Sequence, residues 1–137
     1  MTTDFKKQGK KNRSKGKRFE ERVRQEIIKH GYVPLRNMNN VDLQQNRIIP
    51  GKYSPFNRFT GFPDFLAYRI QTHNPLMGTY CYYIIGVECK LDGRLSKEEK
   101  EKCKWLLDNR MLSLIMIAKK GEKRGEISWE EIKREEK

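Results

Sequence analysis

Two β-rich apolar runs and the turn between them constrain the fold of this chain most strongly. Residues 64–69 (DFLAYR) and 80–89 (YCYYIIGVEC) carry the branched and aromatic side chains that favour strands. His73-Asn74-Pro75 and Gly78 lie between them, so we expect a hairpin of two adjacent strands. A third run at 111–118 (MLSLIMIA) is apolar throughout, which indicates a strand buried on both faces in a central or parallel position.

The spacing of apolar residues predicts helices around these strands. From about residue 15 to residue 30 apolar side chains recur at helical intervals, and Gly31 follows where a left-handed C-terminal cap belongs. A second helix is expected to begin after Ser96, because Ser96 and Glu99 stand in capping-box register, and to end at about residue 109.

The segments outside this pattern carry fewer apolar residues. Residues 1–14 (MTTDFKKQGKKNRS) form a basic arm that cannot bury enough apolar surface to offset chain entropy, so we expect it to be disordered without a partner. Residues 15–137 are expected to form a single domain. Within it, residues 32–36 (YVPLR) indicate a short strand whose proline favours an edge position, and the charged C-terminus after Trp129 indicates a further helix.

The charge of the chain points to a polyanionic partner. With 137 residues, 30 Lys+Arg and 18 Asp+Glu, the chain fits one domain and has a formal net charge of +12. Neutralising phosphates releases condensed counterions, so nucleic acid is the leading candidate, and no long apolar stretch favours a membrane. Cys81, Cys89 and Cys103 form no C-x-x-C pair, so a reducing cytoplasm fits better than a disulfide framework or a structural zinc site.

A long segment at 37–63 has Asn, Gly and Pro punctuation without a sustained period, which predicts a long loop. Loops of this length in compact domains are more often functional than merely connective. The cations Arg47, Lys52 and Arg58 in this loop are candidate phosphate contacts. The aromatic side chains between them suit either base stacking or packing of the loop itself.

Acidic residues stand at the ends of both hairpin runs. Asp64 begins the first run, and Glu88-Cys89-Lys90 closes the second. Strand alternation places Glu88 and Lys90 on one face and Cys89 on the other. If Asp64 lies on the neighbouring strand, two carboxylates converge beside a lysine, and such oxygen ligands suit Mg²⁺, with Mn²⁺ as a substitute. The carbonyl of Cys89 is a further candidate ligand.

This set of groups matches the needs of phosphodiester hydrolysis. The reaction requires an attacking hydroxide, neutralisation of charge on the phosphoryl oxygens and help for the leaving alkoxide, and a carboxylate-held Mg²⁺ serves all three. Asp64 and Glu88 are therefore candidate metal ligands. Lys90 would orient or deprotonate the attacking water, or stabilise charge on the phosphate. The sequence thus predicts a metal-dependent nuclease centre.

These residues and two earlier segments resemble the PD-(D/E)xK nuclease superfamily and, within it, the archaeal-type Holliday junction resolvases. Lys15-Gly16-Lys17-Arg18-Phe19-Glu20 is similar to the K-G-x-x-x-E segment at the start of the family's first helix. His30-Gly31-Tyr32-Val33-Pro34-Leu35-Arg36 is similar to the turn and strand that carry the family's arginine. By this resemblance Glu20 helps to hold the metal, and Arg36 contacts phosphate within the active site.

The resemblance covers roughly residues 15–129 and implies an α/β fold with a restriction-endonuclease-like core, in which helices flank a mixed central β-sheet. It also implies a homodimer that makes paired, Mg²⁺-dependent incisions on opposite strands of a four-way DNA junction. Its first-helix segment adds Lys15, Lys17 and Arg18 to the candidate DNA contacts.

Two features depart from the close family members. The link between Arg36 and Asp64 is longer than theirs, and Ser54 is a loose substitute for the Gly-Ser-Gly element that they often carry there. Residues 88–96 also resemble the virus-type replication-repair nucleases of the same superfamily, so an enzyme for flaps or other branched DNA is the alternative. A non-catalytic basic DNA-binding protein is the alternative outside the enzymes.

Overall fold

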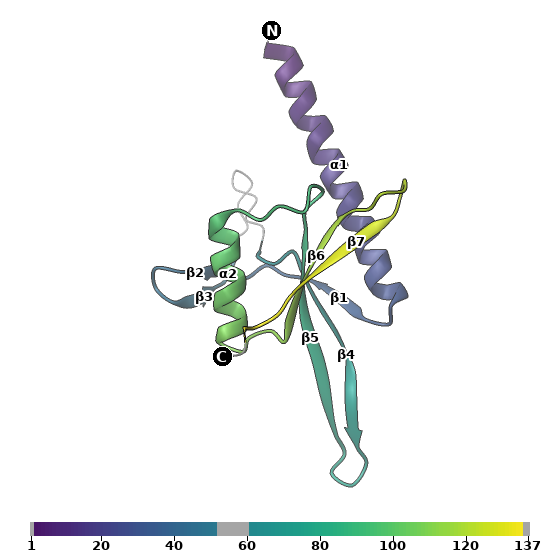
Figure 1. Ribbon diagram of the computed structural model, residues 1–137, viewed down its shortest axis with the longest axis vertical. Helices are drawn as coiled ribbons and strands as arrows, with labels where there is room; N and C mark the ends of the chain where they lie inside the picture. The colour runs from purple at the N-terminus through teal and green to yellow at the C-terminus, as the bar shows by residue number, and fades with distance from the viewer. Residues whose placement is uncertain (1, 52–60, 136–137) are drawn as a thin grey trace.

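The structure is a computed structural model that describes residues 2–51 and 61–135, with side chains from Ser14 onward. In this part of the chain the elements are, in order, α1 (Thr2–Lys29), β1 (Val33–Arg36), β2 (Asn40–Asp42), β3 (Arg47–Ile49), β4 (Phe65–Asn74), β5 (Thr79–Cys89), α2 (Lys97–Asp108), β6 (Leu114–Lys120) and β7 (Ile127–Ile132). Figure 1 shows a central sheet with one helix on each side and a long β4–β5 hairpin that projects from it. The fold is α/β.

The central sheet is mixed and has the strand order β1-β4-β5-β6-β7. Strands β4 and β5 form the predicted hairpin, in antiparallel register from Phe65↔Val87 to Asn74↔Thr79. The predicted central strand is also confirmed, because β6 pairs in parallel with β5 and antiparallel with β7. Strand β1 carries Pro34 at the edge of the sheet, as the missing N–H of proline requires.

Apolar side chains cover both faces of this sheet. On the α1 side Phe19, Val23 and Ile27 pack against the inward residues of β4, β5 and β6. On the α2 side Cys103, Leu106 and Leu107 pack against Ile115 and Ile117. Neighbouring residues of β6 therefore alternate between the two cores, which explains why the whole run is apolar.

Helix α1 begins much earlier than expected. It starts at Thr2 and spans 28 residues, so it takes in the basic arm that composition predicted to be disordered. The arm contains no proline and has four lysines, which extend a helix at little cost once the packed turns around Phe19 have nucleated it. No helix in the described part of the chain is long and apolar enough to cross a membrane.

The C-terminal segment forms a strand, so the predicted charged helix is wrong. Ile127 and Trp129 alternate along β7 and pack against the α1-side core, while Ile132 reaches the α2 side. Strand β7 pairs with β6 from Lys120↔Ile127 to Ile115↔Ile132. The open edge of β6 provides hydrogen-bond partners that outweigh the helix propensity of the charged residues.

The long loop at 37–63 is partly ordered into a small hairpin. Strands β2 and β3 pair from Asn40↔Ile49 to Asp42↔Arg47, and Val41 is buried in the α2-side core. The predicted long loop therefore contains a local two-stranded hairpin at residues 40–49. Lys52 and Arg58 lie outside the described residues.

Gly61 is needed where the chain returns from this loop to β4. A Cβ atom at Gly61 would collide with the carbonyl of Asn37 and lie 2.7 Å from the carbonyl oxygen of Asn39. The backbone N–H of Phe62 donates to that same Asn39 oxygen at 2.9 Å, which fixes the close approach. Only glycine leaves room for these backbones to meet.

Gly61→Ala should therefore lower the free energy of unfolding by about 1 to 3 kcal/mol, since the added methyl has only rigid backbone to displace. Gly16→Ala is the matched control, because a Cβ atom there meets nothing within 4 Å and lies in helix α1. That control should stabilise the protein by about 0.5 to 1 kcal/mol. Denaturant unfolding measures both, and equal effects of the two substitutions would contradict the steric argument.

Candidate active site

The carboxyl groups of Asp64 and Glu88 lie side by side at one end of the sheet. Asp64 immediately precedes β4, and the pairing of Phe65 with Val87 brings it next to Glu88 on β5. Oδ2 of Asp64 accepts a hydrogen bond of 2.8 Å from the backbone N–H of Cys89. Glu88 is only 4% exposed. Burial, followed by the hydrogen bond and the negative charge of Asp64, raises the pKa of Glu88 far above its usual range, although Lys90 opposes this.

Lys90 is held by a residue that sequence reasoning did not assign to the site. Its Nζ lies 2.6 Å from Oε2 of Glu99, in the first turn of α2. Burial lowers the pKa of Lys90, but the hydrogen bond and charge of Glu99, together with Glu88 and Asp64, outweigh burial and raise it overall. Lys90 is therefore a protonated group at neutral pH, a state that the carboxylates around it maintain.

The side chain of Glu99 both caps helix α2 and contacts Lys90. Its Oε1 accepts a 2.9 Å hydrogen bond from the backbone N–H of Ser96, and Ser96 Oγ accepts a 3.1 Å bond from the N–H of Glu99. This capping box confirms the predicted start of α2. Because the capping register fully accounted for Glu99 in the sequence, its contact with Lys90 was missed. The turn at Gly93, which has a φ of 73°, brings the two residues together.

Glu20 and Arg36 complete the set of predicted residues. Helix α1 buries Phe19, which leaves Glu20 at the edge of the apolar stripe, and Arg36 pairs with Phe65 in the β1–β4 register. Arg36 Nη1 lies 3.8 Å from Glu20 Oε2. Burial and the charge of Asp64 raise the pKa of Glu20, outweighing the opposite effects of Arg36 and Lys17. All five predicted catalytic residues thus gather at the same end of the sheet.

Asn37 holds the turn that precedes Asp64. It was not predicted as a site residue, because the sequence placed it in an irregular loop. It is 8% exposed, and its Nδ2 donates to the carbonyl oxygen of Pro63 at 2.9 Å and to that of Asn39 at 3.1 Å. Its backbone N–H donates to the carbonyl of Asp64 at 3.0 Å. The buried side-chain amide thus satisfies two carbonyl groups and the backbone N–H a third, which holds the turn before Asp64 in one conformation.

The oxygen atoms at this end of the sheet fit Mg²⁺. Across residues 2–51 and 61–135 no group of three or more His, Cys, Asp or Glu side chains is placed to hold a metal ion. Mg²⁺ commonly uses only one or two carboxylates and completes its shell with water and substrate phosphate. Asp64 and Glu88 provide such a pair, because a cation beside the buried carboxyl of Glu88 would offset the burial and the negative charge of Asp64, which raise the pKa of Glu88. Burial raises the pKa of the Cys89 thiol, so the carbonyl of that residue is its available donor.

A basic hollow lies beside the carboxylates. It has a volume of about 460 Å³ and is lined by Lys17, Glu20, Glu21, Arg24, Arg36 and Phe65. Two of the predicted DNA contacts, Lys17 and Arg36, line this hollow, and Arg24 is a cation that the sequence analysis did not single out. Lys15 and Arg18 are exposed on the same helix. Arg47 lies elsewhere, on the β2–β3 hairpin, whose Asn46 accepts a hydrogen bond from Trp105 of α2.

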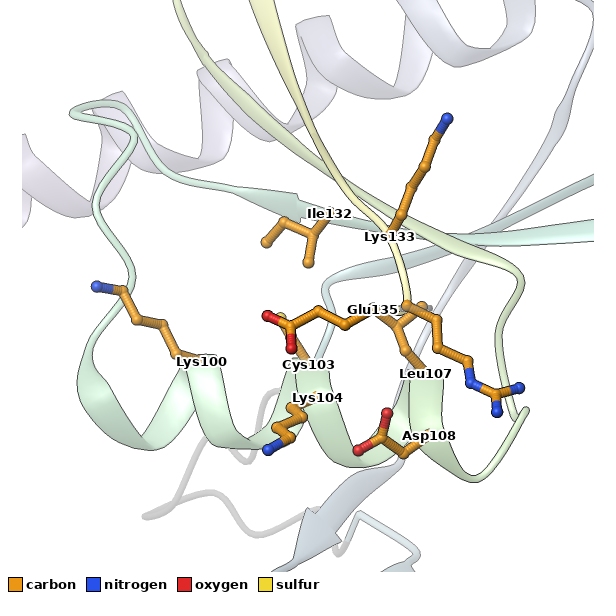
Figure 2. A pocket seen from close by; sticks show the side chains of 9 residues that line it. Lys100, Cys103, Lys104, Leu107, Asp108, Ile132, Lys133 and Glu135 are labelled. Carbon is orange, nitrogen blue, oxygen red and sulfur yellow. The ribbon is translucent and has the colours of Figure 1, made fainter. Parts of the chain in front are cut away.

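A second hollow of about 390 Å³ lies between α2 and the end of β7. Figure 2 shows Lys100, Lys104 and Asp108 along the helix, with the side chain of Glu135 reaching over Cys103 while Lys133 points away. Burial raises the pKa of Cys103 to about 12, so its thiol stays protonated at neutral pH. The thiol among the residues that line this hollow is therefore a poor nucleophile.

Glu88→Gln should stabilise the metal-free protein, increasingly so as the pH rises. Glu88 ionises near its ordinary value of 4.5 in the unfolded chain but keeps its proton in the fold, where its pKa is raised. The stability it contributes is fully present below pH 4.5 and is lost as the pH approaches the folded pKa. Between about pH 5 and pH 8 the wild type should lose up to about 1.4 kcal/mol per pH unit relative to the variant.

Denaturant unfolding in the presence of a chelator measures this difference. Glu122→Gln, which changes an exposed carboxylate in the turn before β7, is the control and should follow the wild type. Parallel pH profiles for the wild type and Glu88→Gln would contradict a raised pKa at Glu88.

Comparisons with protein-family models, with curated proteins and with solved structures give no match for this chain. The chemistry of the site therefore rests on its own geometry: two adjacent carboxyls, a protonated lysine and a basic hollow at one end of a mixed sheet.

Proposed function

We propose that this protein is a Mg²⁺-dependent endodeoxyribonuclease with a restriction-endonuclease-like core of the PD-(D/E)xK type. The observation that carries the proposal is the buried carboxyl of Glu88 against the half-buried carboxyl of Asp64, beside Lys90 at the carboxyl end of β5. A buried carboxyl in contact with a second one destabilises a fold unless a cation binds there or the pair takes part in a reaction. The basic hollow on the α1 side provides access for a phosphate backbone.

The chemistry divides among these residues by position. Asp64, Glu88 and the carbonyl of Cys89 would hold Mg²⁺, and Glu20 stands where it can bind a metal-associated water. When bound, the ion activates water and neutralises charge on the phosphate and the leaving oxygen. Lys90 is kept protonated by Glu99, so it acts as a donor to a phosphoryl oxygen rather than as the base. Arg36 and Lys17 orient the incoming phosphate from the side of α1.

The favoured substrate is branched DNA, and in particular a four-way junction cut by a homodimer. Two equivalent incisions need two centres, and a two-fold dimer provides one for each strand. Resolution of junctions rests on the resemblance of residues 15–36 and 64–90 to the resolvase pattern. A nuclease for flaps is the alternative within the same chemistry. The three cysteines are free thiols, which suits a cytoplasmic location.

Purified protein should cleave labelled four-way junctions in Mg²⁺, and Asp64→Asn and Lys90→Ala should each reduce the rate by at least about a hundredfold. Asp64→Asn removes a charged metal ligand, and Lys90→Ala removes the donor to the phosphate. Asp108→Asn, at the far end of α2, is the control and should cut like the wild type. Flaps, plain duplex and single strands are tested in parallel.

The outcomes separate the alternatives. Activity that survives both substitutions would place the catalytic centre elsewhere. Cutting of flaps but not of junctions would favour the replication-repair type of nuclease. Binding of branched DNA without cleavage in either Mg²⁺ or Mn²⁺ would identify a non-catalytic DNA-binding protein.

Glu99→Gln should lower kcat about tenfold or more while leaving KM nearly unchanged, because Lys90 acts at the reacting phosphate and loses its ionic partner. Gln can still accept the hydrogen bond from Ser96, so the helix cap is retained. Glu98→Gln is the matched control, one residue away and paired instead with Lys102 at 3.6 Å. Equal kinetics for the two variants would show that Glu99 only caps the helix.

A further inference from the structure

The turn between β6 and β7 lies at the same end of the sheet as Glu88. Strand β6 runs parallel to β5 and places Ala118 opposite Cys89. The backbone N–H of Lys90 donates to the carbonyl oxygen of Ala118 at 2.9 Å. Lys120 stands two residues beyond Ala118, which is roughly 7 Å at the usual rise of a strand. In Figure 1 the turn projects at the upper end of the sheet, where β5 also ends.

This turn is rich in cations. Residues 119–124 (KKGEKR) contain four cations and one carboxylate. Lys119 packs over Gly93, where an added Cβ atom would lie 2.7 Å from Lys119 Cδ. On that side Arg94 and Lys100 line a hollow of about 470 Å³. We define the second basic surface by six cations, of which Lys119 is half-buried and the others are exposed: Arg94, Lys100, Lys119, Lys120, Lys123 and Arg124.

The turn holds its cations in a fixed arrangement. The N–H of Gly121 donates to the carbonyl oxygen of Glu126 at 2.8 Å, and the N–H of Glu126 donates to that of Lys123 at 3.1 Å. Gly125 has a φ of 80°, in the left-handed region that glycine adopts without strain. An ordered turn loses less conformational entropy on binding than a flexible one, so its cations contribute more to affinity.

The position of this surface complements that of the basic hollow. The strand order β1-β4-β5-β6-β7 sets the hollow at Arg36 towards one edge of the sheet and the turn towards the other, with Asp64 and Glu88 between them. Neighbouring strands lie about 4.8 Å apart, so the path from β1 to β7 is on the order of 20 Å. That length accommodates several successive phosphates of one DNA strand.

We propose that the second basic surface binds the phosphate backbone of the DNA on the β7 side of the carboxylates. A strand that crosses the end of the sheet would pass Arg36, then the carboxylates and then Lys120. One continuous strand meets the cations on both sides of the site, which favours DNA over a separate acidic protein. The position of the cut between the two surfaces rests on the proposed function, whereas the binding of DNA by this surface does not require cleavage.

Binding of a labelled four-way junction in the presence of a chelator, measured by fluorescence anisotropy over a series of KCl concentrations, tests the proposal. The triple variant Lys120→Gln, Lys123→Gln, Arg124→Gln should bind at least about tenfold more weakly. It should also reduce the slope of log K against log [KCl] by about 2 to 3, because each lost phosphate contact contributes about 0.9 to that slope. Arg124→Gln alone should reduce the slope by about 0.9, which keeps the test decisive if the triple variant does not fold.

The matched control is Lys104→Gln, Lys133→Gln, Arg134→Gln, in the hollow between α2 and the end of β7 (Figure 2). Each triple variant removes three cations, so both lower the formal net charge from +12 to +9. The control should keep the slope of the wild type, because its cations lie at the other end of β7.

The proposal is overturned if the wild type binds no DNA, if a folded variant of the turn keeps the wild-type slope, or if the control loses as much as the turn variant. Weaker binding with an unchanged slope would also overturn it, since the lost contact would not be to phosphate. In Mg²⁺ the turn variant should raise KM and leave kcat nearly unchanged, because the contact is the same before and during the reaction. A wild type that binds the junction through this surface without cutting it would contradict the nuclease function alone.

Discussion

The contact between the carboxyl groups of Asp64 and Glu88 is the constraint around which this end of the molecule is organised. The carboxyl of Glu88 is buried against that of the half-buried Asp64 at the end of β5, and this arrangement disfavours the ionised form of Glu88 unless a cation lies nearby. Its neighbours are placed accordingly. Cys89 donates its backbone N–H to Asp64, Asn37 fixes the turn before Asp64, and Lys90, just after the end of β5, opposes the negative charge.

Helix α2 is tied to this site by one side chain. Glu99 completes the capping box and also holds Lys90, so the start of the helix and the position of the lysine depend on the same carboxylate. A shift of α2 would therefore move Lys90, the proposed donor to the substrate phosphate. Since the contact also keeps Lys90 protonated, it favours electrostatic stabilisation over proton abstraction as the contribution of this residue to the proposed cleavage.

The two sides of the protein present opposite surface chemistry. The α1 side carries Lys17, Arg24 and Arg36 around a hollow next to the carboxylates, which suits a phosphate backbone. The hairpin on the other side has no formal charge over 18 consecutive residues, from Ile70 to Val87, and exposes tyrosine and isoleucine. The basic hollow and the exposed aromatic hairpin are thus separate surfaces of the described part of the chain.

The sequence by itself determined the local features: the β4–β5 hairpin, the buried strand β6, the edge position of β1 and the capped start of α2. These follow from periodicity and turn chemistry within short windows. Only the tertiary structure decided what depends on distant partners. The edge of β6 made the charged C-terminus a strand, and nucleation by the packed turns extended α1 through the basic arm. Folding also brings Glu99 to Lys90 and the Asn37 amide to the Pro63 carbonyl, and spacing along the chain does not encode either contact.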